Sequence, residues 1–277
     1  MPFTLCHPAI VLPLYRYARR FTSLPGLVIG SMAPDFVYFF SLGIPGSFTH
    51  TLLGVLLYCI PAGLIVYLLY HLLIRDAVLA WLPKPISDRM GGPVYWPLRS
   101  AQSVATVMGS LAVGAASHIA WDSFTHANTV IVNSYEIFRT LVPLGGYQIP
   151  LFKILQQLSS LVGFIVIAAF VAVWFQRTVP VMKSTKSLRT RQKVLAFAGV
   201  LVAGMAGGVA GLLLRQPKSI EHGLFSFVVS GMAAAALTII CLCCVWQVRA
   251  RRRIAENADA ALTRFPISTS GSTDKLP

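Results

Sequence analysis

Residues 155–175 read LQQLSSLVGFIVIAAFVAVWF, a stretch that contains no charged side chain. A helix that crosses the hydrocarbon core of a bilayer needs about 20 mostly apolar residues, and this stretch supplies them. Two later runs, 194–214 and 223–248, are equally free of charge. The run 51–74 also qualifies, because a proline such as Pro61 is tolerated inside a packed membrane bundle. These four runs predict transmembrane helices.

Two further apolar runs are interrupted by polar residues. The run 27–44 carries a Pro-Asp pair at its middle, and 103–121 carries a histidine and ends against an aspartate. A shorter segment, 8–14, is expected to be a re-entrant or interfacial helix. The predicted fold class is therefore all-α: a polytopic membrane helical bundle of about six transmembrane helices plus a short N-terminal helix.

The composition agrees with a membrane protein. Of 277 residues, 56% are hydrophobic and 12% are charged, whereas soluble domains carry about 25% charged residues. This excludes a soluble enzyme, a disordered regulator and a coiled coil. The net charge of +14 does not indicate nucleic-acid binding, because the cations lie in clusters between the apolar runs. The five cysteines predict no disulfide framework, since three of them lie within one apolar run.

The cation clusters predict the orientation of the chain. Numbered along the chain, the six apolar runs are 27–44, 51–74, 103–121, 155–175, 194–214 and 223–248. The cation clusters precede the first run and follow the second, fourth and sixth runs, while the alternate loops hold few cations. By the positive-inside rule the clustered loops are cytoplasmic, and so is the C-terminus. The N-terminus does not have the charge order of a signal peptide and is expected to be mature protein. The clustered cations are Arg16, Arg19, Arg20, Arg75, Lys84, Arg89, Arg99, Arg177, Lys183, Lys186, Arg189, Arg191, Lys193, Arg249, Arg251, Arg252 and Arg253.

The chain divides into two predicted parts. Residues 1–254 form an integral membrane helical domain, in which the polar residues that carry chemistry lie within 1–126 and the helices of 151–248 serve as scaffold. Small-xxx-small glycine spacing in 194–214 favours close helix packing. Residues 255–277 are polar and rich in Ser and Thr, which predicts a disordered cytoplasmic tail.

Histidine and aspartate are the candidate functional residues, because ionisable groups within membrane segments are costly. His118 and Asp122 are four residues apart, so a helix projects them from one face, and together they can share a divalent metal. His126 continues this face if the helix continues. The predicted orientation places His50 at the same membrane face.

Two more residues complete the candidate metal site. Asp35 follows Pro34, which bends a helix and frees a backbone carbonyl. His7 reaches the same face as His118 if the segment after it runs inward as a short helix. The predicted metal ligands are His7, Asp35, His50, His118 and Asp122.

Other interpretations of these residues stay open. A lone histidine in a membrane helix serves more often as an interhelical hydrogen-bond partner than as a ligand. Asp35 can also be interpreted as a protonated buried carboxyl that stabilises the bundle or relays protons. His118 and Asp122 can also be interpreted as a pair that only fixes helix packing. His71 and His222 are read as interfacial residues without a role.

Four short motifs, in this order, resemble an uncharacterised bacterial membrane family, domain-of-unknown-function family 4184. The same order is similar to membrane-bound metal-dependent hydrolases and, distantly, to zinc-dependent phospholipases C. In this chain Ser47-Phe48 precede the Thr49-His50 pair, whereas the hydrolases have Arg-Gly at that place. The motifs are Met1-Pro2-Phe3-Thr4-x-x-His7-Pro8, Gly30-Ser31-x-x-Pro34-Asp35, Phe48-Thr49-His50-Thr51 and Ser117-His118-x-x-x-Asp122-Ser123-Phe124-Thr125-His126.

The resemblance implies a bacterial inner-membrane protein with zinc or a similar ion held by the five ligands. The expected reaction is hydrolysis of a phosphoester or related bond in a lipid or lipid-linked substrate, with membrane lipids as neighbours and no nucleic-acid partner. Asp35 is the candidate general base, and His126 the candidate acid that protonates the leaving group. The alternative is a non-enzymatic membrane protein, a carrier or an envelope scaffold, with a His/Asp polar core.

Overall fold

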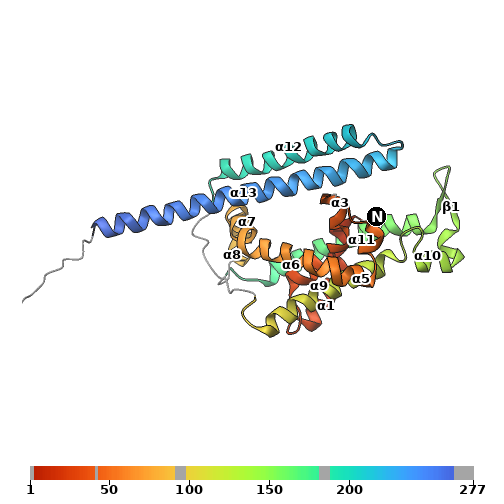
Figure 1. Ribbon diagram of the computed structural model, residues 1–277, viewed down its shortest axis with the longest axis horizontal. Helices are drawn as coiled ribbons and strands as arrows, with labels where there is room; N and C mark the ends of the chain where they lie inside the picture. The colour runs from red at the N-terminus through yellow and green to blue at the C-terminus, as the bar shows by residue number, and fades with distance from the viewer. Residues whose placement is uncertain (1–2, 41–42, 91–97, 181–187, 265–277) are drawn as a thin grey trace, which may run out of the picture.

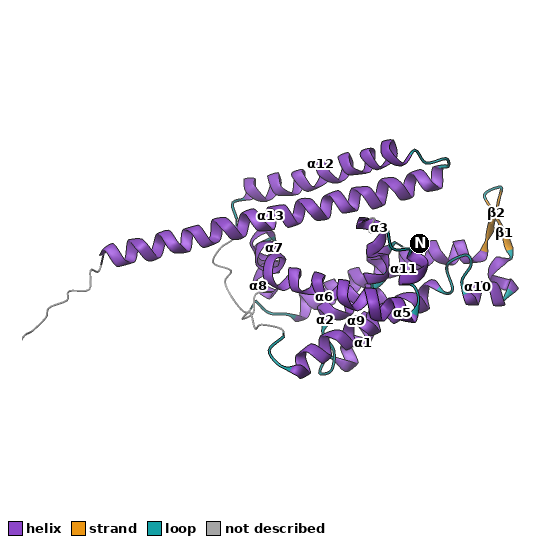
Figure 2. Ribbon diagram, viewed as in Figure 1, coloured by secondary structure: helices purple, strands orange, loops and turns teal. Residues whose placement is uncertain are grey.

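The computed structural model describes residues 3–40, 43–90, 98–180 and 188–264, and these residues are almost entirely helical (Figure 2). The described part contains one antiparallel strand pair, β1 (Leu141–Leu144) with β2 (Tyr147–Pro150). This confirms the all-α class. The helical elements are η1 (Thr4–Cys6), α1 (Pro8–Ala18), α2 (Leu24–Gly30), η2 (Ala33–Asp35), α3 (Phe36–Phe40), α4 (Gly46–Thr49), α5 (Leu52–Gly54), η3 (Val55–Cys59), α6 (Ile60–Leu69), η4 (Tyr70–Ile74), α7 (Arg75–Trp81), α8 (Lys84–Met90), α9 (Ala101–Asp122), α10 (Val130–Ser134), η5 (Glu136–Arg139), α11 (Leu151–Arg177), α12 (Thr190–Arg215) and α13 (Ile220–Arg264).

Within the described residues, five helices are long and apolar enough to cross a membrane. One of them, Leu52–Trp81, joins α5, α6 and α7 through the π-helical segments η3 and η4. The other four spans lie in α9, α11, α12 and α13. Their length and composition are those of a polytopic membrane protein, as the sequence predicts.

The first predicted run along the chain, 27–44, is not a continuous helix. It is divided into α2, the 3-10 turn η2 and the short helix α3, and residues 41 and 42 lie outside the described residues. Pro34 explains the break, because it lacks the N–H that a helix requires and its ring clashes with the preceding turn. The broken segment places Asp35 in the 3-10 turn rather than along a transmembrane helix face.

The first two helices form a hairpin against α9. The chain turns back after α1, and the backbone N–H of Ser23 donates to Ser110 Oγ at 2.8 Å, midway along α9. From there α2 runs parallel to α9, so that the carbonyl of Ser31 reaches the His118 ring. At 1.5 Å per residue the hairpin extends about 18 Å along α9 from its Asp122 end. The N-terminal segment therefore enters the bundle and returns.

Glycines allow α2 to approach α9 closely. A Cβ added at Gly30 would lie 2.4 Å from the Leu111 carbonyl oxygen, and one added at Gly114 would lie 2.5 Å from the Leu27 carbonyl oxygen. No side chain larger than hydrogen fits at either contact. The two backbones thus touch directly, which fixes the position of the turn that carries Asp35 relative to the end of α9.

The helices α12 and α13 lie side by side and form a second hairpin along one side of the molecule (Figure 1). Small residues line their contact, as the predicted glycine spacing requires; Gly207, for example, faces Ala234. The helix α13 continues through Arg264, past the boundary predicted at residue 254. The rest of the predicted tail, residues 265–277, lies outside the described residues.

Candidate metal centre

All five predicted metal ligands meet at one end of the bundle. They come from four separate places in the chain: the residue before α1, the turn η2, the end of α4 and the last turns of α9. Four of the five are buried, and the His50 side chain is partly exposed. The residues are His7, Asp35, His50, His118 and Asp122.

Four ligand atoms form a closed ring in which nitrogen and oxygen alternate. His50 Nε2 lies 3.6 Å from Asp35 Oδ1, which lies 3.6 Å from His118 Nε2. His118 Nε2 lies 3.3 Å from Asp122 Oδ2, which lies 3.7 Å from His50 Nε2. Donor atoms bound to one ion at about 2.0–2.2 Å are about 3.0–3.6 Å from their neighbours. The four sides of the ring, 3.3–3.7 Å, are therefore close to the spacing of donor atoms around one ion.

Two atoms of the ring have no hydrogen-bond partner among the described residues. These are Asp35 Oδ1 and His118 Nε2, and both are buried. A buried polar atom without a partner costs about 1–3 kcal/mol, so native proteins rarely tolerate two of them side by side. Both atoms face the ring, and a metal ion there would bind them. The buried His/Asp groups can thus hold a divalent ion, and imidazole with carboxylate is a donor set that suits zinc and its neighbours.

Backbone carbonyls orient the two histidines of the ring. His118 Nδ1 lies 2.7 Å from the Ser31 carbonyl, and His50 Nδ1 lies 2.8 Å from the Gly46 carbonyl. A carbonyl only accepts, so each Nδ1 carries a proton, and in the neutral imidazole each Nε2 presents a lone pair to the ring. Metal-binding histidines are commonly held by such a bond at their other nitrogen.

Threonine hydroxyls hold the turn that carries Asp35. Thr4 Oγ1 donates to Asp35 Oδ2 at 2.7 Å, which leaves Oδ1 free to face the ring. Thr49 Oγ1 donates to the Pro34 carbonyl at 2.8 Å. Neither threonine, nor Ser31, is predicted from the sequence to have a role at the site. Their position inside the short motifs was the one signal for them.

His7 lies beside the ring, on the other face of Asp122. Its Nε2 is 3.1 Å from Asp122 Oδ1, and its ring stacks on His118 with centroids 3.8 Å apart. Its Nδ1 is 3.3 Å from the Thr4 carbonyl. One of its nitrogens also lies within 4.8 Å of donor atoms of Asp35 and His118. His7 is therefore placed to support Asp122 and to join an ion held by its neighbours.

His126, the predicted acid, lies one turn beyond α9. Its Nδ1 is 3.3 Å from the Asp122 carbonyl oxygen and 3.5 Å from Asp122 Oδ1. Its Nε2 is 3.3 Å from the side-chain amide of Gln156 in α11, a helix that the sequence assigned to scaffold. Burial lowers the pKa of His126 below its usual value, which favours the neutral imidazole. Its contact with Asp122 through Oδ1 leaves Oδ2 for the ring.

The site is open on one side. The side chains of His50 and His126 are 21% and 23% exposed, whereas those of His118 and Asp35 are fully buried. Solvent therefore reaches the site at His50 and at His126.

Comparison with known proteins gives a family and no characterised relative. A search of curated proteins and a search of solved structures each found no match to this chain. A family model described as "Domain of unknown function (DUF4184)" matches residues 1–244, which include every residue of the site and four of the five long helices in full. The chain is a member of this family.

Proposed function

We propose that the protein is a membrane-embedded metal-dependent hydrolase that cleaves a phosphoester bond in a lipid or lipid-linked substrate. The single observation that carries this proposal is the ring of His50, Asp35, His118 and Asp122, two atoms of which are buried without a partner. His7 is proposed as a fifth ligand. A packing cluster would satisfy its own polar atoms, whereas this ring leaves unpaired the lone pairs that a cation requires.

The charges of the ring suit a divalent ion. Two ionised aspartates offset its charge of two, and the neutral imidazoles add donor atoms without adding charge. When bound, zinc or a similar ion lowers the pKa of a coordinated water towards about 7, which supplies hydroxide at neutral pH. The ion itself is proposed to be zinc, because the donors are imidazole nitrogen and carboxylate oxygen.

Asp35 and His126 are the proposed general base and acid. Asp35 Oδ1 faces the ring and Thr4 holds the other oxygen, so Oδ1 accepts a proton as the base only while it does not bind the ion. Burial lowers the pKa of His126, so its partly exposed ring takes up a proton from solvent before it protonates the leaving oxygen. Its partly exposed ring beside Asp122 is within reach of a substrate that enters next to His50.

The site's position favours a lipid substrate. It lies where α5 begins and α9 ends, at one end of two long apolar helices. The cation clusters support an orientation with this end at the outer face of the bilayer and the C-terminus in the cytoplasm, and the resemblance of the motifs supports a bacterial inner membrane. Phosphoesters of lipid headgroups lie at this depth.

Elemental analysis of the purified protein tests the metal first. We expect near-stoichiometric zinc or manganese that a His118→Ala/Asp122→Ala double variant loses. The matched control is His222→Ala/Asp76→Ala, which also removes one imidazole and one carboxylate but at positions outside the cluster. Absence of metal in the unaltered protein after zinc and manganese are added back would overturn the proposed site.

Turnover is the second test. Protein that holds metal is assayed with phospholipid vesicles and with a chromogenic phosphodiester, and we expect hydrolysis that the double variant lacks. Bound metal without hydrolysis of either substrate would favour the alternative, a carrier or envelope scaffold with a metal-binding core.

A further inference from the structure

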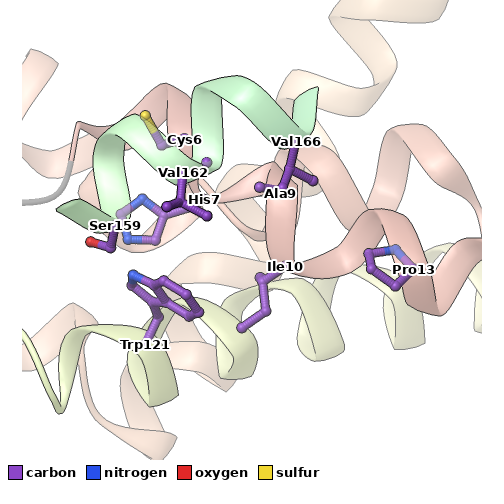
Figure 3. Close-up of a pocket in the computed structure, with 10 residues that line it drawn as sticks. Cys6, His7, Ala9, Ile10, Pro13, Trp121, Ser159, Val162 and Val166 are labelled. Atoms are coloured by element: carbon purple, nitrogen blue, oxygen red, sulfur yellow. The ribbon is translucent and has the colours of Figure 1, made fainter. Parts of the chain in front are cut away.

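A cavity of about 170 Å³ lies between α1, the end of α9 and α11. Its walls are aliphatic along most of their length, and its polar groups gather at one end, where His7 and Ser159 lie near Trp121 (Figure 3). Pro13 marks the opposite end (Figure 3). The remaining lining residues are Cys6, Ala9, Ile10, Val162, Gly163 and Val166.

The cavity connects with the metal centre through His7. The same imidazole that lines the cavity contacts Asp122 Oδ1 at 3.1 Å and stacks on His118. Trp121, which also lines the cavity, directly precedes Asp122 at the end of α9. The polar end of the cavity is therefore part of the wall of the candidate site.

The cavity runs from the metal centre towards the middle of the bundle. Along α1 its lining advances from His7 to Pro13, and along α11 from Ser159 to Val166. At the end of the bundle that holds the cluster, the backbone N–H of Phe3, shortly before α1, donates to Ser160 Oγ of α11. An acyl chain follows the same course in a bilayer, from the headgroup at the interface into the hydrocarbon.

We propose that this cavity binds the acyl chain of the substrate lipid next to the headgroup that the metal centre acts on. This inference rests on the proposed hydrolase function and adds the part of the substrate that determines specificity. The aliphatic walls suit methylene groups and offer no partner to a sugar or a peptide backbone. The ligand class is therefore a lipid with at least one extended hydrocarbon chain.

A bulky side chain in the cavity tests the proposal. Val166→Trp fills the space from α11, and Val173→Trp is the matched control because it lies two helical turns further along the same helix, outside the cavity lining and 45% exposed. The quantity measured is the ratio of two hydrolysis rates, that of a long-chain phospholipid to that of a water-soluble phosphodiester. We expect Val166→Trp to lower this ratio by about tenfold, since binding energy from the remote chain assists the reaction, and Val173→Trp to leave it unchanged. An unchanged ratio in both variants would overturn the proposal.

Photo-crosslinking separates this inference from the proposed reaction. A phosphatidylethanolamine with a diazirine in one acyl chain is incorporated into vesicles with the full chain, and crosslinked peptides are mapped. We expect labelling of residues 8–13 and 159–166 that Val166→Trp suppresses and Val173→Trp does not. This result without any turnover would support the acyl site and reject the hydrolase. Turnover together with labelling that Val166→Trp does not alter would reject the acyl site alone.

Discussion

Asp122 connects four imidazoles through its two oxygens. Oδ1 lies near His7 and His126, and Oδ2 lies near His50 and His118. Oδ2 belongs to the ring, while Oδ1 is occupied by groups outside it. Asp122 therefore supplies one of the two negative charges of the site and, of the two aspartates, contacts the larger number of histidines.

Asp122→Asn is expected to lower metal occupancy strongly and to leave membrane insertion intact. The amide keeps the size of the side chain but removes the negative charge that offsets the ion. Elemental analysis reports occupancy, and alkaline extraction of membranes reports insertion. Asp76→Asn, whose carboxylate pairs with Arg75 away from the cluster, is the control. Full occupancy in Asp122→Asn would show that Asp122 is not a ligand.

Thr4→Val is expected to weaken metal binding by about 10–100-fold, the usual effect of removing a group that orients a ligand. Valine has nearly the same shape as threonine but cannot donate to Asp35 Oδ2, so the free oxygen loses its orientation. Competition with a metal chelator measures the affinity. Thr4→Ser restores the hydroxyl and should restore the affinity. If Thr4→Val binds metal as tightly as the unaltered protein, the hydroxyl does not orient the ligand.

The contact of α2 with α9 determines whether the ring can form. Asp35 and the Ser31 carbonyl belong to the α2 side, whereas His118 and Asp122 belong to α9. Gly30 and Gly114 let the two backbones touch, so the distance between the two halves of the ring depends on the absence of a side chain at both positions.

Gly114→Ala is expected to destabilise the protein by about 1–3 kcal/mol, the usual cost of overpacking, and to lower metal occupancy as well. Its added methyl group would meet the backbone of Leu27 and Ser31. Gly109→Ala is the control in the same helix, because nothing lies within 4 Å of the added methyl group. Thermal unfolding in detergent measures the first effect and elemental analysis the second. Equal behaviour of the two variants would contradict the packing argument.

The molecule as a whole combines a polar cluster at one end with long apolar helices that carry it. Cations gather in the loops at the other end of these helices and within the C-terminal part of α13, where four arginines lie between residues 249 and 253. This distribution predicts the orientation in the membrane independently of the cluster.

Replacement of Arg251, Arg252 and Arg253 by alanine is expected to disturb the orientation and to leave the metal in place. The three cations favour the cytoplasmic side for the end of α13, and they lie far along the chain from every ligand. A C-terminal reporter measures orientation, and elemental analysis measures metal. Loss of metal with unchanged orientation would mean that the metal site extends beyond the N-terminal half.

The sequence by itself determined the helical class, the long apolar spans and the identity of the candidate ligands. Length and hydropathy decide whether a helix can span a bilayer, and both are properties of a local segment such as 155–175. The spacing of His118 and Asp122 likewise predicts a shared helix face, because the period of a helix is local. The break at Pro34 was visible as an interruption, but its result, a 3-10 turn that carries Asp35, was not.

Only the tertiary structure decided how the ligands meet and what surrounds them. The ring joins residues 35, 50, 118 and 122, which touch because α2 packs against α9 through glycines and because the chain turns back after α1. The contributions of Thr4, Ser31 and Gln156 are single hydrogen bonds across the chain. Local patterns do not encode such contacts, because a hydroxyl or a carbonyl gains its role from the partner that packing brings within 3 Å or so.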